Sequence, residues 1–115
     1  MNRRPPRKNL LFYLEVIDQQ TQTLLGHLGD ISMKGIMIIA HTPLTIHEIR
    51  NISIKLPDLE EFSKKSIEAQ IEVRWCKMDV NPELYCLGCQ FLEINTDNAA
   101  IVQEAQEILG FSEEL

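Results

Sequence analysis

A chain of 115 residues can form one domain with a single hydrophobic core, but not a substrate domain plus a cofactor domain. Its apolar fraction of 44% and charged fraction of 24% are typical of globular proteins, and no run approaches the roughly 20 consecutive apolar residues of a membrane-spanning helix. The net charge of −6 disfavours general DNA or RNA binding, because an acidic surface repels a long polyanion. No signal peptide is recognisable, so we expect a cytoplasmic domain without membrane insertion.

Residues 1–9 are predicted to form a flexible basic arm. Four basic side chains precede the first acidic residue: Arg3, Arg4, Arg7 and Lys8. Without these four charges, the rest of the chain carries −10 instead of −6. A guanidinium group can bind a phosphate through two parallel hydrogen bonds and can stack on a purine. The arm therefore favours a local site for one small anionic ligand.

Residues 10–115 are predicted to form the folded domain, which begins with strands. Leu10–Ile17 is rich in apolar and aromatic residues, and a polar turn separates it from a second strand, Thr23–Ile31. Ile36–Ala40 is a short apolar run that predicts a third strand. In the fourth, Asn51–Leu56, apolar and polar residues alternate.

The second half of the chain is predicted to hold two more strands and a helix. Residues 58–66 are a charged connection of unassigned role, with at most one helical turn. Strict alternation over Ile67–Trp75 predicts a strand whose apolar face, Trp75 included, belongs to the core. The last strand covers Leu84–Ile94. From about Asp97 the apolar residues repeat with a helical period, and Asn95, Thr96 or Asp97 can cap the start of this helix.

Six short strands followed by one amphipathic helix predict a mainly β fold. We expect a six-stranded antiparallel β-barrel with a C-terminal α-helix packed against it. Closure of the sheet removes the exposed edge strands that so small a sheet would otherwise present.

The segment Asp30-Ile31-Ser32-Met33-Lys34-Gly35 is a candidate binding turn at the end of the second strand. Asp30 and Ser32 are two residues apart, so their side chains project to the same side and can offer an acceptor and a donor together. Gly35 can supply a positive φ for a tight reversal, or let a ligand approach the backbone. A basic arm alone is most often a solvated tail, and such a turn alone most often bonds its own backbone. Their joint occurrence at this spacing indicates a site.

These two motifs and the later strands resemble those of the PilZ domain family, the receptor module for the bacterial second messenger cyclic diguanylate (cyclic di-GMP). The family motifs RxxxR and [D/N]xSxxG are present as Arg3 to Arg7 and as Asp30, Ser32 and Gly35. Val73-Arg74-Trp75 and Leu87-Gly88-Cys89-Gln90-Phe91 are similar to the later strands of the family. The resemblance extends from Arg3 to about Gly110 and implies a split-barrel fold of the PilZ type.

The resemblance implies a stand-alone receptor that relays the cyclic di-GMP signal, in processes such as motility and biofilm formation, to a protein effector that the sequence does not identify. Arg3 and Arg7 would contact the ligand phosphates and guanines, with Arg4 assisting. Asp30 and Ser32 would read a guanine edge, and Gly35 would shape the turn. We expect the ligand to order the arm, which would then present a surface to the effector. The alternative is an adaptor of the same fold that acts through protein contacts alone, for example in pilus or motility machinery.

Catalysis and metal binding find no support in the sequence. No nucleophile with a base and no paired carboxylates are recognisable, so we expect a protein that is not an enzyme and has no cofactor besides its ligand. Cys86 and Cys89 are spaced like metal ligands, but on a strand they face opposite sides and no second pair accompanies them. A barrel that binds single-stranded nucleic acid is disfavoured by an aromatic fraction of 6%.

Overall fold

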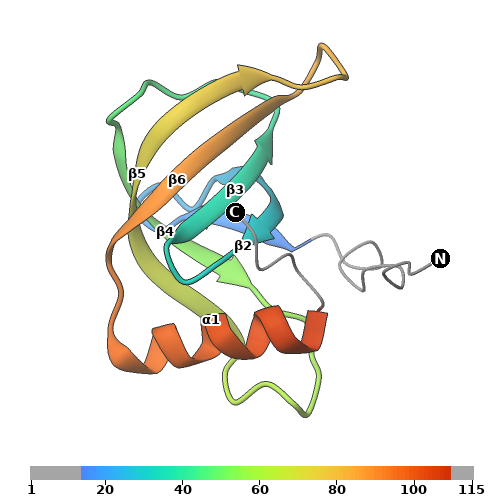
Figure 1. Ribbon diagram of the computed structural model, residues 1–115, viewed down its shortest axis with the longest axis vertical. Helices are drawn as coiled ribbons and strands as arrows, with labels where there is room; N and C mark the ends of the chain where they lie inside the picture. Colours follow the sequence, from blue (N-terminus) through green and yellow to red (C-terminus); the bar gives the residue numbers. More distant parts are fainter. Residues whose placement is uncertain (1–13, 110–115) are drawn as a thin grey trace, which may run out of the picture.

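Six antiparallel strands close into a barrel, and one helix lies across an end of it (Figure 1). The computed structural model describes residues 14–109 of the chain. The elements are β1 (Glu15–Asp18), β2 (Leu24–Ile31), β3 (Gly35–Ala40), β4 (Ile49–Lys55), β5 (Ser66–Met78), β6 (Tyr85–Glu93) and α1 (Thr96–Leu109). The strand order is β1-β2-β3-β6-β5-β4, and β4 pairs with β1 to close the barrel. The predicted six-stranded antiparallel barrel with a C-terminal helix is therefore confirmed.

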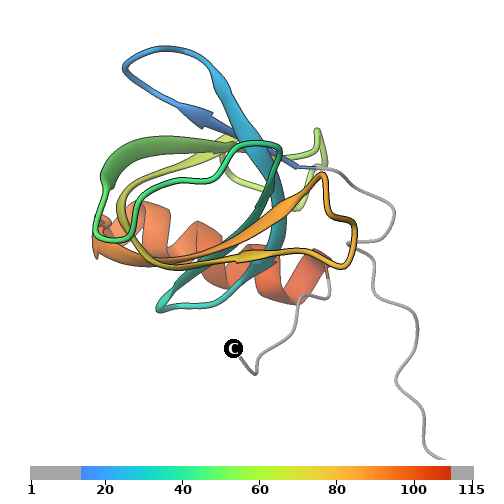
Figure 2. The same cartoon turned by 90° about the horizontal axis from the view of Figure 1, so that it is seen from above.

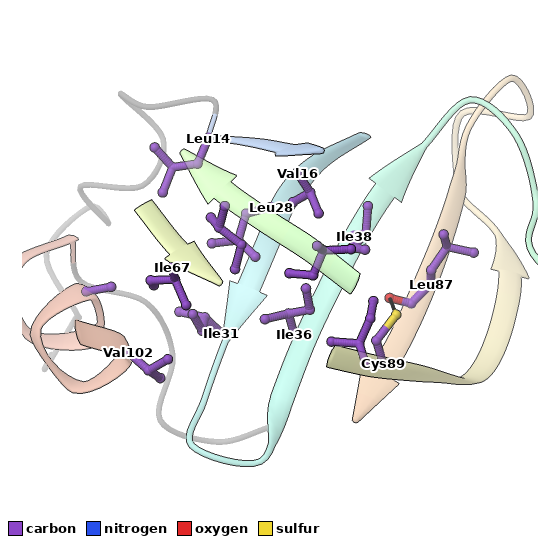
Figure 3. Close-up of a cluster of buried hydrophobic side chains, with 14 of the residues drawn as sticks. Leu14, Val16, Leu28, Ile31, Ile36, Ile38, Ile67, Leu87, Cys89 and Val102 are labelled. Carbon is purple, nitrogen blue, oxygen red and sulfur yellow. Dashed lines mark hydrogen bonds between the residues drawn. The ribbon is translucent and has the colours of Figure 1, made fainter. Parts of the chain in front are cut away.

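The core is built from the inward-facing residues of all six strands, as their alternating patterns require. Figure 3 labels ten residues of the core, which include Leu14 just before β1 and Val102 of α1 besides strand residues, and their side chains point toward a common interior. The isoleucines of β3, β4 and β5 dominate the core, and several of them are completely excluded from solvent. The apolar stripe of α1 covers one end of the barrel through Ile101, Val102 and Ala105.

The charged connection before β5 has a structural role that its sequence did not reveal. It contains no helix, only a turn in which Phe62 N–H donates to the carbonyl of Leu59 at 3.1 Å. The Phe62 side chain is buried in the main core, and Leu56 and Leu59 pack against that core. The connection therefore contributes apolar side chains to the barrel core instead of remaining a solvated loop.

Two asparagines fix the start of α1 to the barrel. The side-chain oxygen of Asn95 accepts the N–H of Asn98 at 2.8 Å, which makes Asn95 the helix cap. The side-chain oxygen of Asn98 in turn accepts the N–H of Glu68 on β5 at 3.0 Å. The helix start is thereby held against β5.

Trp75 does not belong to the core, contrary to the expectation from its alternating position. The pairing of β5 with β6 matches Val73 with Cys89 and Trp75 with Gly88, so Arg74 is one extra residue on β5. Such a bulge reverses the faces of the residues that follow it. Val73 is fully buried, whereas Trp75 remains 39% exposed on the outer wall.

An ionic cluster joins β1 to β4 at the seam where the barrel closes. Arg50 on β4 donates to the buried carboxylate of Asp18 at 2.9 Å and also pairs with Glu48. Burial by itself would raise the pKa of Asp18, but hydrogen bonds from Thr21, Arg50 and Gln20 outweigh it and hold that pKa below its usual range. The backbone N–H of Thr45 and the Arg50 guanidinium lower the pKa of Glu48 as well.

We predict that Asp18→Asn lowers the free energy of unfolding at neutral pH by about 1–3 kcal/mol, because Arg50 loses a buried charged partner. Because the pKa of Asp18 is lower in the folded than in the unfolded state, its ionised carboxylate stabilises the protein at pH values above the unfolded-state pKa. This stabilisation is lost as the pH falls and the carboxylate becomes protonated. The stabilities of wild type and variant should therefore converge as the pH falls below about 4. Urea unfolding at several pH values measures this. Glu15→Gln, on the exposed face of the same strand, is the control and should match wild type throughout.

Candidate functional site

A pocket of about 520 Å³ lies on the outer wall of the barrel, where the β2–β3 turn meets β5, β6 and α1. Its polar lining comes from Ser32, Lys34, Arg74, Gln90 and Gln106. Its apolar lining includes Met33, Ile36, Met37, Trp75 and Cys89. The pocket therefore combines a flat apolar surface with two cations and several neutral hydrogen-bonding groups.

The predicted binding turn forms one side of this pocket through Ser32 and Gly35. Ser32 N–H donates to the carbonyl of Gly35 at 2.9 Å and closes the turn. The hydroxyl oxygen of Ser32 accepts the N–H of Lys34 at 3.1 Å, so its hydroxyl hydrogen can still be donated to another acceptor.

Asp30 lies on the same outer face but does not line the pocket. It pairs with Met37 of β3, and the next residue, Ile31, points into the core. Its carboxylate accepts the N–H of Ile31 at 2.9 Å, and its side chain is largely buried. The structure therefore brings Ser32 and Gly35 to the pocket and places Asp30 on the neighbouring part of the outer wall.

Glycine is required at position 35 because of a close contact with β6, and not because of a positive φ. Its φ is not in the left-handed region, and a Cβ there would lie 2.0 Å from the carbonyl oxygen of Cys89. The side chain is excluded because β3 and β6 approach closely where Gly35 pairs with Gln90. Gly35 therefore sets the position of the turn relative to β6.

The indole of Trp75 forms a rigid platform at the floor of the pocket. It lies directly on Gly88, where a Cβ would come within 2.0 Å of the ring. The ammonium group of Lys77 lies 5.5 Å from the ring centroid. An exposed aromatic ring beside cations is suited to stacking with a flat, electron-rich ligand such as a purine.

Arg74, the bulge residue, adds a positive charge at the pocket rim. Its guanidinium donates to the side-chain oxygen of Gln90 on β6, which holds it beside Trp75. Sequence reasoning placed Arg74, Trp75 and Gln90 on strands but did not assign them to the site, because alternation alone does not reveal a bulge. The signal that was present is an aromatic residue between two basic ones, Arg74 and Lys77, combined with a glycine on the next strand.

The predicted arginines Arg3, Arg4 and Arg7 lie outside the described residues. Their position relative to this pocket therefore stays a prediction. The described part of the site consists of the turn, the Trp75 platform and Arg74.

The family model described as PilZ domain matches residues 1–106. The chain belongs to the PilZ family. The members of this family are receptor or adaptor domains. The match includes both sequence motifs and all six strands of this PilZ domain.

Two solved structures share the fold. The inhibitor of motility MotI/DgrA from Bacillus subtilis is 24% identical with a TM-score of 0.67, over 94% of this chain and 51% of that one. This PilZ domain therefore spans about half the length of that structure. The PilZ domain of YcgR from Escherichia coli, solved with cyclic di-GMP, is 14% identical with a TM-score of 0.63, over 85% and 81% of the two chains. No curated protein gave a significant match.

The three cysteines are free thiols in different surroundings. Cys89 is buried in the barrel, which raises its pKa to about 12, and Cys86 donates to the carboxylate of Asp79 at 3.5 Å.

In residues 14–109 no three His, Cys, Asp or Glu side chains are gathered so as to hold a metal ion. Within the same range no helix has both the length and the apolar character needed to cross a bilayer.

We predict that Gly88→Ala displaces the Trp75 indole from its platform and destabilises the domain by about 1–3 kcal/mol, because a rigid ring has no room beside the new methyl group. Since this is the single tryptophan of the chain, its emission maximum reports the displacement directly. Gly29→Ala is a matched control on β2. Its methyl group would meet the flexible end of Met37 at 2.7 Å and the side chain of Ile39 at 3.2 Å but not the indole, so the emission should not shift.

Proposed function

We propose that this PilZ domain is a non-enzymatic, cytoplasmic receptor that binds cyclic di-GMP on the outer wall of its barrel. The observation that carries the proposal is a pocket lined by both the Ser32–Gly35 turn and the Trp75 platform. A guanine can stack on the indole while its edge accepts a hydrogen bond from the Ser32 hydroxyl. Arg74 and Lys34 supply positive charge for the phosphates at the pocket rim.

The basic arm completes the site in this proposal. Arg3 and Arg7 bind the phosphates and guanines, with Arg4 assisting, and Asp30 reads a guanine edge together with Ser32. The ligand thereby brings residues 1–9 onto the folded domain, and the newly ordered surface is recognised by a protein effector. YcgR, whose PilZ domain was solved with cyclic di-GMP, and the motility inhibitor MotI support this assignment by their common fold.

Calorimetric titration of cyclic di-GMP tests the site. We expect the wild type to release heat on binding and Arg7→Ala to bind at least about tenfold more weakly, because charge-assisted hydrogen bonds contribute about 1.5–3 kcal/mol. Trp75→Ala should weaken binding about fivefold or more through lost stacking. Leu24→Ala, which removes a comparably exposed apolar side chain from another hairpin, should leave the affinity unchanged.

Absence of heat with the wild type would contradict nucleotide binding and favour the adaptor function. Circular dichroism of each variant controls for loss of fold. Binding should also weaken as salt concentration rises, since charged groups of the ligand and the arm interact through solvent.

NMR spectroscopy of the labelled domain tests the role of the arm. On addition of cyclic di-GMP, the amide signals of Lys8 and of Ser32 should shift together, because both flank the same ligand. Signals of His41, in a loop away from the pocket, should stay in place and serve as an internal control. A ligand that shifts Ser32 while leaving Lys8 unaffected would remove the arm from the mechanism.

A further inference from the structure

The outer half of β5 is an open sheet edge, among the residues that the structure describes. The β4–β5 ladder ends where Ile49 pairs with Glu72, and Val73 is bonded to the backbone of His47 and Glu48. From Arg74 to Met78, β6 is the only strand of the described chain that pairs with β5. Figure 1 shows this part of the β5–β6 hairpin at the end of the barrel opposite α1, and Figure 2 shows its turn projecting to one side.

The backbone groups that face this edge can be assigned from the register. Asp79 N–H donates to the carbonyl of Leu84, and Lys77 pairs with Cys86. Lys77 and Asp79 therefore exchange backbone hydrogen bonds with β6. The N–H and C=O groups of the alternate residues, Cys76 and Met78, point away from β6 toward the open edge. Among residues 14–109, the backbone donors and acceptors of Cys76 and Met78 therefore have no partner along the open edge.

The side chains along the edge are partly apolar. Trp75 is 39% exposed and Met78 is 62% exposed, so a strand added here would cover apolar surface as well as hydrogen-bonding groups. Lys77 and the bulge at Arg74 discourage indiscriminate pairing, as charges and bulges do on natural sheet edges. A partner strand must therefore place no positive charge opposite Lys77 or Arg74.

We propose that a second copy of this chain pairs with the edge, β5 against β5, about a twofold axis at Cys76. This register places Trp75 opposite the partner's Lys77 and Arg74 opposite the partner's Met78. No like charges face one another, and the partner's Lys77 continues the contact that Lys77 already makes with Trp75 within one chain at 5.5 Å. The backbone groups of Cys76 bond reciprocally across the axis.

The neighbouring registers are worse. An axis at Lys77 would place two lysines directly opposite each other, which is destabilising. An axis at Met78 would extend the pairing into the turn that follows β5, which ends at this residue. Charge pattern and strand length thus favour the register at Cys76 over these two.

Sedimentation equilibrium of the full chain without nucleotide, over concentrations up to millimolar, tests the proposal independently of ligand binding. We expect a reversible twofold rise in mass. Met78→Pro removes one outward N–H from each copy and takes no donor from the β6 ladder, so it should weaken the dimer at least about tenfold. Val80→Ser is the matched control, because Val80 is 99% exposed on the same hairpin but lies beyond the paired segment. It should leave the dimer unchanged.

A monomer at all concentrations would overturn the proposal, and so would a dimer that survives Met78→Pro or is lost with Val80→Ser. If Met78→Pro does not fold by circular dichroism, Lys77→Glu replaces it and should weaken the dimer severalfold by removing the cation opposite Trp75. Hydrogen exchange then tests the register. The amides of Cys76 and Met78 should exchange about tenfold more slowly at high protein concentration, and unchanged exchange at both would contradict edge pairing.

Discussion

One extra residue in β5 determines what the outer wall of the barrel presents. Because Arg74 has no counterpart on β6, Val73 remains in the core while Trp75 is turned outward onto Gly88. Without the bulge, the indole would point into an interior already filled by isoleucine side chains. The same local change brings the Arg74 guanidinium to Gln90 and to the rim of the pocket. The candidate site thus depends on a single insertion in the ladder.

Glycines complete this arrangement by letting neighbouring segments approach closely. Gly88 provides the flat surface on which the indole rests, and Gly35 allows the binding turn to lie against the carbonyl of Cys89. These two contacts fix the turn and the platform relative to β6. The two walls of the pocket are therefore positioned by backbone geometry, which is more rigid than contacts between long side chains.

The sequence predicted the architecture well because the strands have clear patterns. Alternation located β4 and β5, the helical period located α1, and Asn95 was among the expected caps. The segment Asp30–Gly35 was correctly placed at the end of a strand. The positive φ considered for Gly35 is not present, and the structure shows a constraint from Cys89, which is distant in sequence.

Other parts of the site and fold could not be read from the sequence for physical reasons. A bulge is set by the pairing of two strands, so the strict alternation up to Trp75 gave the wrong face for that residue. Phe62 stands among charged residues, and only the closed barrel shows the apolar interior that it enters. The pocket itself joins residues from the β2–β3 turn to α1 that no local pattern connects.

The seam between β1 and β4 has a consequence for how the chain folds. Four of the six neighbouring strand pairs are consecutive in the chain. The other two are β3–β6 and β1–β4, and in the latter β2 and β3 lie between the paired strands in sequence. Closing so long a loop is slow, because chain entropy is lost before the contacts form. β1 has only four residues, and the Arg50–Asp18 pair supplies a specific contact at this seam. Because so few residues hold the seam, we expect the barrel to open there first.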